Sequence, residues 1–307
     1  MKKTSLFLAI LLLLCLCSCS RIKIGSFSIS GHTYADANKY SVGSFSYRSS
    51  DVDRICLEYI SGDVTVVQSA NRTLNVSETE KGLSDDQKMH WYMDGRTLRI
   101  QFAKSGYSGT FPSNSKKLTL EIPFGVELEL AVTSGSVTAS TDLEVKHAYF
   151  AATSGDYQLK TVRTEDFEFG ATSGSIGVDA VYADKAKFGS TSGPTVVKLI
   201  NASIITFGST SGNTTMDNIT ASEVEGASTS GNISLSFDYC KKLKTACTSG
   251  NVTISRIPKN GASIEYDKTS GTLKADGYMV KNNRMVFGEG GCEMDITTTS
   301  GNLIINN

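Results

Sequence analysis

The sequence contains few of the residues on which catalytic and metal sites depend. Among its 307 residues there are three histidines and one tryptophan, and the histidines (His32, His90 and His147) lie far apart in the chain. The seven cysteines form no CxxC pair and no cysteine–histidine cluster at the spacing of metal ligands, which excludes the common zinc motifs. No histidine stands in a recognisable motif with a nucleophile. We therefore expect a protein that is not an enzyme and that has no catalytic residue, metal or cofactor.

An excess of charge of one sign is also absent. The chain has 30 lysines and arginines against 31 aspartates and glutamates, which gives a formal net charge of −1. Proteins that bind nucleic acid, or a membrane through a polybasic patch, carry a clear basic excess. We therefore expect neither kind of partner on electrostatic grounds.

Long apolar runs are missing except at the N-terminus. Two lysines precede an apolar run over residues 6–16, which is shorter than the roughly 20 residues of a membrane-spanning helix. The run ends in the sequence LCSC at residues 16–19, which resembles the bacterial lipobox. We predict that residues 1–18 are a lipoprotein signal peptide and that Cys19 carries a lipid. This lipid would anchor the exported, surface-exposed protein to a membrane of the cell envelope. An ordinary secretory signal is the alternative.

The most regular feature of the sequence is the tripeptide Thr-Ser-Gly. Five of its successive intervals are 19 residues long, and the others are 20, 21 and 30. A fixed period of this size is typical of a solenoid. Apolar residues recur two and four positions after the glycine and seven and five positions before it, and alternation by two indicates strands. We predict an all-β fold, a parallel β-helix or β-solenoid with rungs of about 19 residues. The motif glycines are Gly135, Gly155, Gly174, Gly193, Gly212, Gly231, Gly250, Gly271 and Gly301.

Phenylalanine recurs five residues before the motif glycine in four successive rungs, which predicts a stacked aromatic ladder in the core. The ladder stops at Gly226 and Thr245, where the core must be filled in another way. The motif glycine is predicted to form a corner with positive φ. The motif threonine is predicted to form a hydroxyl ladder beside that corner, although a flat threonine array that binds ice or a glycan is an alternative. The ladder residues are Phe150, Phe169, Phe188 and Phe207.

The chain before the regular repeats is predicted to form a tether and a cap. Residues 19–50 are rich in serine and glycine, which favours a flexible tether. Residues 51–130 are predicted to start the solenoid and to cover its open end with β-hairpins, and residues 131–307 to form the repeats. Trp91 is either a platform for stacking a sugar or, as we favour, a residue that packs the cap onto the first rung.

Four cysteines remain in the mature chain besides the predicted lipid site, namely Cys56, Cys240, Cys247 and Cys292. The short separation of Cys240 and Cys247 makes a disulfide between them conceivable, because an exported protein is permitted to form one. Buried free thiols are the favoured alternative.

Several segments, in order, resemble a known bacterial family. They are ICLEYISGDVTV at residues 55–66, HWYMDGRTLRIQFAKSG at residues 90–106, LTLEIP at residues 118–123 and the Thr-Ser-Gly rungs. Together they are similar to the "putative adhesin" family, whose members are β-strand-repeat domains of unknown function. The resemblance covers residues 51–307 and implies the solenoid fold, but it implies no catalytic residue.

The sequence therefore favours a surface-anchored, non-enzymatic β-solenoid lipoprotein that acts as an adhesin or a display scaffold. Its partner would be a glycan or a protein of the envelope or the surrounding matrix. An accessory or sensor protein of the envelope stress response is the alternative. A polysaccharide-degrading β-helix enzyme is disfavoured because the acidic residues of successive rungs do not align.

Overall fold

The computed structural model describes residues 32–306 except residues 72, 80, 112–115 and 283. The predicted signal peptide, Cys19 and residues 19–31 of the predicted tether lie outside this range. The described chain divides into two compact units, one up to Asp166 and one from Phe167 onward. This division differs from the boundary at residue 130 that the sequence suggested, because rungs on both sides of that residue pair with one another inside the first unit.

Nearly all regular structure in the described residues is β-strand, which confirms the predicted all-β solenoid. Two short 3-10 turns, η1 (Ala37–Lys39) and η2 (Ser49–Asp51), are the exceptions. The strands of the N-terminal unit are β1 (Ser41–Val42), β2 (Phe45–Arg48), β3 (Arg54–Tyr59), β4 (Asp63–Gln68), β5 (Thr73–Glu78), β6 (His90–Asp94), β7 (Thr97–Gln101), β8 (Lys117–Ile122), β9 (Glu127–Val132), β10 (Val137–Ala139), β11 (Leu143–Glu144), β12 (His147–Ala152) and β13 (Tyr157–Arg163). Those of the C-terminal unit are β14 (Asp166–Ala171), β15 (Ile176–Ser190), β16 (Thr195–Val197), β17 (Ile200–Ser209), β18 (Thr214–Ser228), β19 (Ile233–Cys247), β20 (Val252–Arg256), β21 (Ala262–Lys268), β22 (Leu273–Ala275), β23 (Met279–Lys281), β24 (Arg284–Phe287), β25 (Cys292–Thr298) and β26 (Leu303–Ile305).

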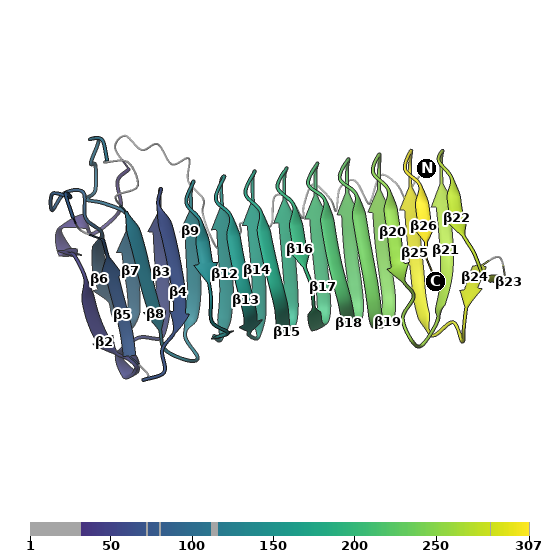
Figure 1. The fold of residues 1–307 in the computed structure, drawn as a ribbon, viewed down its shortest axis with the longest axis horizontal. Helices are drawn as coiled ribbons and strands as arrows, with labels where there is room; N and C mark the ends of the chain where they lie inside the picture. The colour runs from purple at the N-terminus through teal and green to yellow at the C-terminus, as the bar shows by residue number, and fades with distance from the viewer. Residues whose placement is uncertain (1–31, 72, 80, 112–115, 283, 307) are drawn as a thin grey trace. The chain divides into compact units, whose positions relative to one another are not determined.

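The N-terminal unit is built from two sheets that begin with hairpins and continue as parallel rungs (Figure 1). One sheet has the order β1-β6-β7-β3-β9-β12, and the other has the order β2-β5-β8-β4-β10-β13. In the first sheet the pairs β1–β6 and β6–β7 are antiparallel, and in the second sheet the pairs β2–β5 and β5–β8 are antiparallel. The remaining pairs in both sheets are parallel. The predicted capping hairpins are therefore present, and they cover strand edges that would otherwise be free to pair with other chains.

The described part of the predicted tether is folded, which corrects that prediction for residues 32–50. β2 pairs antiparallel with β5, and β1 pairs with β6. Along β2, Phe45 and Tyr47 alternate with polar residues, and both rings contact Trp91 at centroid distances of 4.0 Å and 5.6 Å. The serine-rich composition concealed this alternation, which is sufficient to hold a short edge strand.

The C-terminal unit shows the predicted 19-residue register. Val181 pairs with Ile200, and Ile200 pairs with Ile219, each on the next rung. The aromatic ladder is also present in the core, where the rings of Phe169, Phe188 and Phe207 are almost completely buried. These rings fill the single layer between the two sides of each rung, as the phase of the repeat predicted.

The aromatic ladder stops at Gly226 for a specific reason. Gly226 pairs with Phe207 on the preceding rung. A Cβ at Gly226 would overlap the Phe207 ring, which therefore occupies the space that a side chain would need. Glycine on one rung thus makes room for the phenylalanine of its neighbour.

The motif glycines serve mainly to let neighbouring rungs approach. φ is positive at Gly62 (102°) and Gly271 (104°), as predicted for a corner, but not at Gly193. A Cβ at Gly193 would instead overlap the carbonyl oxygen of Gly174 on the adjacent rung. The prediction of positive φ is therefore wrong for rungs such as that of Gly193, where close backbone contact excludes any side chain.

An asparagine ladder, which we did not predict from the sequence, follows the motif glycine. Asn232 N donates to Asn213 Oδ1 at 2.8 Å, and Asn251 N donates to Asn232 Oδ1 at 2.9 Å. Asn302 N then donates to Asn251 Oδ1 at 3.0 Å, although 51 residues separate them. Each side chain satisfies a backbone group of the next rung that the corner leaves unpaired.

The last rung in the sequence is not the last rung in space. β25 pairs with both β19 and β21, and β26 pairs with both β20 and β22 (Figure 1). The C-terminal rung thus lies between two rungs that are consecutive in the chain. The 30-residue interval before Gly301 contains the hairpin of β23 and β24, and β24 pairs antiparallel with β21. This hairpin lies on the side of β21 that faces away from the displaced rung.

Candidate functional site

A row of ring side chains lies on the N-terminal unit, and we call His32, Tyr34, Tyr40 and Tyr92 the aromatic row. The ring centroids of successive members are 6.1 Å, 4.6 Å and 5.5 Å apart. All four side chains are half-buried, so each ring keeps part of its surface in solvent. Rings placed in this way offer apolar faces to a ligand while remaining fixed by their neighbours.

The row lies on the outer face of the sheet that contains β6. Side chains alternate between the faces of a strand, and the preceding residue, Trp91, points inward to stack on Phe45 of the opposite sheet at 4.0 Å. Tyr92 therefore points outward, where it meets Tyr40 from the segment before β1.

The N-terminal segment that carries three of the four rings is held by hydrogen bonds to the loop after β7. Tyr34 N donates to Ser105 Oγ at 3.1 Å, and Tyr34 OH donates to the Ala103 carbonyl at 3.0 Å. Gly106 N donates to the His32 carbonyl at 2.7 Å. Burial raises the pKa of both Tyr34 and Tyr40 to about 12, so their phenols are neutral at physiological pH.

Charged side chains flank the row. Lys39 Nζ lies 5.4 Å from the centroid of the Tyr92 ring. Arg99 Nη2 lies 3.0 Å from Asp94 Oδ2, and these side chains are 44% and 51% exposed. Ion pairs this exposed contribute little to stability. Their donors and acceptors can therefore be turned toward hydroxyl groups of a ligand at small cost.

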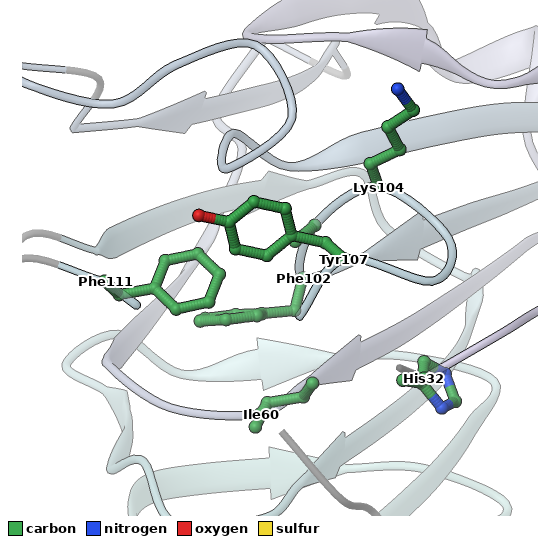
Figure 2. Close-up of a pocket in the computed structure, with 7 residues that line it drawn as sticks. His32, Ile60, Phe102, Lys104, Tyr107 and Phe111 are labelled. Atoms are coloured by element: carbon green, nitrogen blue, oxygen red, sulfur yellow. The ribbon is translucent and has the colours of Figure 1, made fainter. Parts of the chain in front are cut away.

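His32 also lines a shallow recess that continues from the row. Figure 2 shows the rings of Phe102, Tyr107 and Phe111 gathered on one side of this recess, across from His32 and Ile60. The Phe111 ring is 4.7 Å from Phe102 and 5.2 Å from Tyr107. The recess has a volume of about 10 Å³, which is roughly enough for one water molecule. It therefore adds apolar surface to the row but no enclosed ligand cavity.

A buried ion pair supports the wall of the recess. Lys116 Nζ lies 2.8 Å from Glu78 Oε1, and the two side chains are 1% and 0% exposed. The ammonium also donates to the carbonyls of Phe102 at 2.7 Å and Gln87 at 2.5 Å. Glu78 accepts hydrogen bonds at 2.7 Å from Tyr59 OH and from Met89 N.

The groups that bond to Lys116 and Glu78 indicate that this ion pair has a structural role. Each charged group is saturated by groups that the fold itself supplies, so neither is left to act on a substrate. Burial lowers the pKa of Lys116 from its usual value. Lys116 follows a polar stretch, so the sequence around this residue does not indicate that its side chain is buried.

The other residues singled out from the sequence do not form a second site. Trp91 packs against Phe45 and Tyr47 of β2, so its packing contacts lie within the cap and not, as predicted, on the first rung. His90 Nδ1 contacts the Lys88 carbonyl at 3.0 Å, and His147 Nδ1 lies 3.1 Å from Asp166 Oδ2. The predicted lipid site, Cys19, lies outside the described residues.

The described residues contain neither a candidate metal site nor a helix of membrane-spanning length. No group of three or more histidine, cysteine, aspartate or glutamate side chains in this part of the chain is placed to hold a metal ion. No helix within the described ranges has the length and apolar character needed to cross a membrane.

Comparison with solved structures supports the fold through a match with a TM-score above 0.5. A crystal structure described as a "putative adhesin" from Parabacteroides merdae is 15% identical, with a TM-score of 0.55 over 87% of this chain and 96% of that chain. One with the same description from Bacteroides fragilis is 15% identical, with a TM-score of 0.44 over 87% of this chain and 97% of that chain. A comparison with curated proteins found no match.

The family models agree with the repeat described above. The model of the Toastrack family, DUF4097, matches residues 52–239 and again residues 197–307. The two matches together span both units of the described chain and include the glycine corners and stacked rungs. The chain therefore belongs to the Toastrack DUF4097 family.

Proposed function

We propose that the protein is a non-enzymatic, surface-displayed binding scaffold of the adhesin type that recognises a carbohydrate through the aromatic row. The observation that carries this proposal is the continuous series of half-exposed rings from His32 to Tyr92. The description of the Parabacteroides merdae structure as a "putative adhesin" supports the same class of function. Anchoring through a lipid on Cys19 would place this surface outside the membrane.

The chemistry of the row suits a sugar. Pyranose rings present apolar C–H faces that pack against aromatic rings, and their hydroxyl groups pair with planar polar side chains. The row supplies the rings, while Arg99, Asp94 and Lys39 supply the polar groups at its edge. A protein partner is the competing occupant, because tyrosine and arginine are also enriched at protein interfaces.

A glycan array probed with the mature chain tests the proposal. The wild-type protein should bind a defined set of glycans, and Tyr92→Ala together with Tyr40→Ala should reduce this binding at least tenfold. Tyr92→Phe keeps the ring and should retain most of it. Tyr239→Ala is a matched control, because Tyr239 is 38% exposed and lies on β19 in the other unit.

Two outcomes would count against the proposal. Absence of glycan binding by the folded wild-type protein would overturn the carbohydrate assignment. Equal binding by the wild type and by the Tyr40 and Tyr92 alanine variants would place the ligand elsewhere on the chain.

A further inference from the structure

Small buried side chains pair between neighbouring strands of the C-terminal unit. Ala202 pairs with Ala221, and Ala221 pairs with Cys240 on the next rung. Cys292, at the start of β25 in the displaced rung, pairs with Ala262 on β21. All of these side chains are buried, and both cysteines are 0% exposed. Each cysteine is thus paired with an alanine of a neighbouring strand, Cys240 with Ala221 and Cys292 with Ala262.

The two thiol groups lie close enough for each to shift the pKa of the other. Cys240 Sγ also contacts the Lys242 carbonyl at 3.3 Å. The interaction with Cys292 lowers the pKa of Cys240, whereas the interaction with Cys240 together with burial raises the pKa of Cys292. Cys240 is therefore the better nucleophile of the two.

The strand register brings the two backbones within disulfide range. Lys242 on β19 pairs with Glu293 on β25, so Cys240 and Cys292 are offset by one residue along neighbouring strands. A strand spacing of about 4.8 Å and a rise of about 3.3 Å give a Cα separation of about 5.8 Å. Disulfides usually join Cα atoms about 4.4–6.8 Å apart.

We propose that Cys240 and Cys292 form a disulfide that fastens the displaced C-terminal rung to β19 when the protein folds in an oxidising compartment. The oxidant is a small-molecule disulfide or an oxidised dithiol protein. The Cys240 thiolate attacks one of its sulfurs and expels a thiolate, which forms a mixed disulfide. The Cys292 thiolate then attacks the Cys240 sulfur and expels the second thiolate. Two protein thiols are thus oxidised, and one external disulfide is reduced to two thiols.

The location of this bond matters because of the chain topology. The strand that begins with Cys292 lies between β19 and β21, and it is reached only after the β23–β24 hairpin. The disulfide would close the chain segment that contains β20 to β24 into a covalent loop. Closing a loop of this size stabilises a fold mainly by restricting the unfolded chain.

The other described cysteines provide internal controls. Cys247 is buried in a column of hydroxyl residues, pairs with Ser228 and Thr298, and contacts the Gly231 carbonyl at 3.5 Å. Cys56 lies in the N-terminal unit, where its thiol contacts Glu129 Oε2 at 3.4 Å and burial raises its pKa to about 12. Neither has a cysteine as a partner, and both should remain thiols.

Thiol mapping of the exported full-length protein tests the proposal. The protein is denatured in a thiol-alkylating reagent without reductant, digested and analysed by mass spectrometry. The expected result is alkylation of Cys56 and Cys247 together with a disulfide-linked peptide pair that contains Cys240 and Cys292. Complete alkylation of Cys240 and Cys292 before reduction, or a link from Cys240 to Cys247, would overturn the proposal.

A thermal measurement tests the consequence for stability. Reduction should lower the melting temperature of the wild-type protein by roughly 5–15 °C. The Cys240→Ala, Cys292→Ala double variant should fold, because each cysteine already pairs with an alanine of a neighbouring strand, and reduction should not change its melting temperature. Cys247→Ser is the matched control and should keep the wild-type response. An equal response to reduction in the double variant would contradict the proposed bond.

Discussion

Lys116 and Glu78 form an ion pair with a separation of 2.8 Å at a position that excludes solvent from both side chains. Replacing Lys116 with methionine would leave the Glu78 carboxylate buried without its counter-charge. We expect the free energy of unfolding to fall by about 3–5 kcal/mol. Chemical denaturation of Lys116→Met measures this loss, with Lys117→Met as the control at an exposed neighbouring position. Equal stability of the two variants would show that the pair is not important for folding.

The stability of the N-terminal unit should decrease in mild acid because of His90. Burial lowers the pKa of His90 below its ordinary value of 6.5. As the pH falls through about 6.5, the unfolded chain binds a proton at this histidine before the folded chain does, so protonation favours unfolding. His90→Gln should therefore lose less stability than the wild type between neutral pH and pH 5.5. Denaturant titrations at both pH values measure the difference, and identical losses would exclude His90 as a contributor.

The pairing of Gly226 with Phe207 predicts two single changes that are each destabilising. Gly226→Ala introduces a Cβ that overlaps the Phe207 ring, at a cost of about 1–3 kcal/mol. Phe207→Leu leaves unfilled space at the same place and should lower stability by a similar amount. In the double variant the smaller side chain makes room for the added methyl group, so the combined loss should be less than the sum. Strict additivity in a double-mutant cycle would contradict this packing relationship.

The lipid assignment predicts the cellular fraction in which the protein is found. Cys19→Ala removes the thiol that would carry the lipid, so the protein should move from the membrane fraction to the soluble fraction. Cys17→Ala changes a neighbouring cysteine that is preceded by leucine, and this variant should remain with membranes. Fractionation followed by immunoblotting distinguishes the two, and membrane retention of Cys19→Ala would exclude the anchor.

The repeat was predictable because its physical causes are local and recur at a fixed phase. The close approach of neighbouring rungs requires glycine at positions such as Gly193, and a single apolar layer requires inward residues such as Phe188 and Phe207. Each signal appears many times, so the sequence predicts the solenoid and its register without long-range information.

The aromatic row and the displaced rung were not predictable by the same means. Tyr34 and Tyr40 lie in a serine-rich segment, and their role depends on hydrogen bonds and ring contacts with the distant residues Ser105 and Tyr92. The long interval before Gly301 indicates an insertion but not which strand edges the last rung joins. Such pairings depend on which edges remain open after the rest of the unit has formed.

The position of the C-terminal rung has a consequence for biosynthesis. A repeat protein whose rungs follow the order of the chain can add each rung as it leaves the ribosome or the export channel. Here β21 and β22 emerge before β25 and β26. In the folded unit β21 and β22 nevertheless pair with β25 and β26, and not with β19 and β20, which precede them in the chain. A chain that ends early therefore lacks an internal rung, and its preceding strands have no neighbour on which to stack. The C-terminal unit can reach its native pairing only after β25 and β26 have been synthesised.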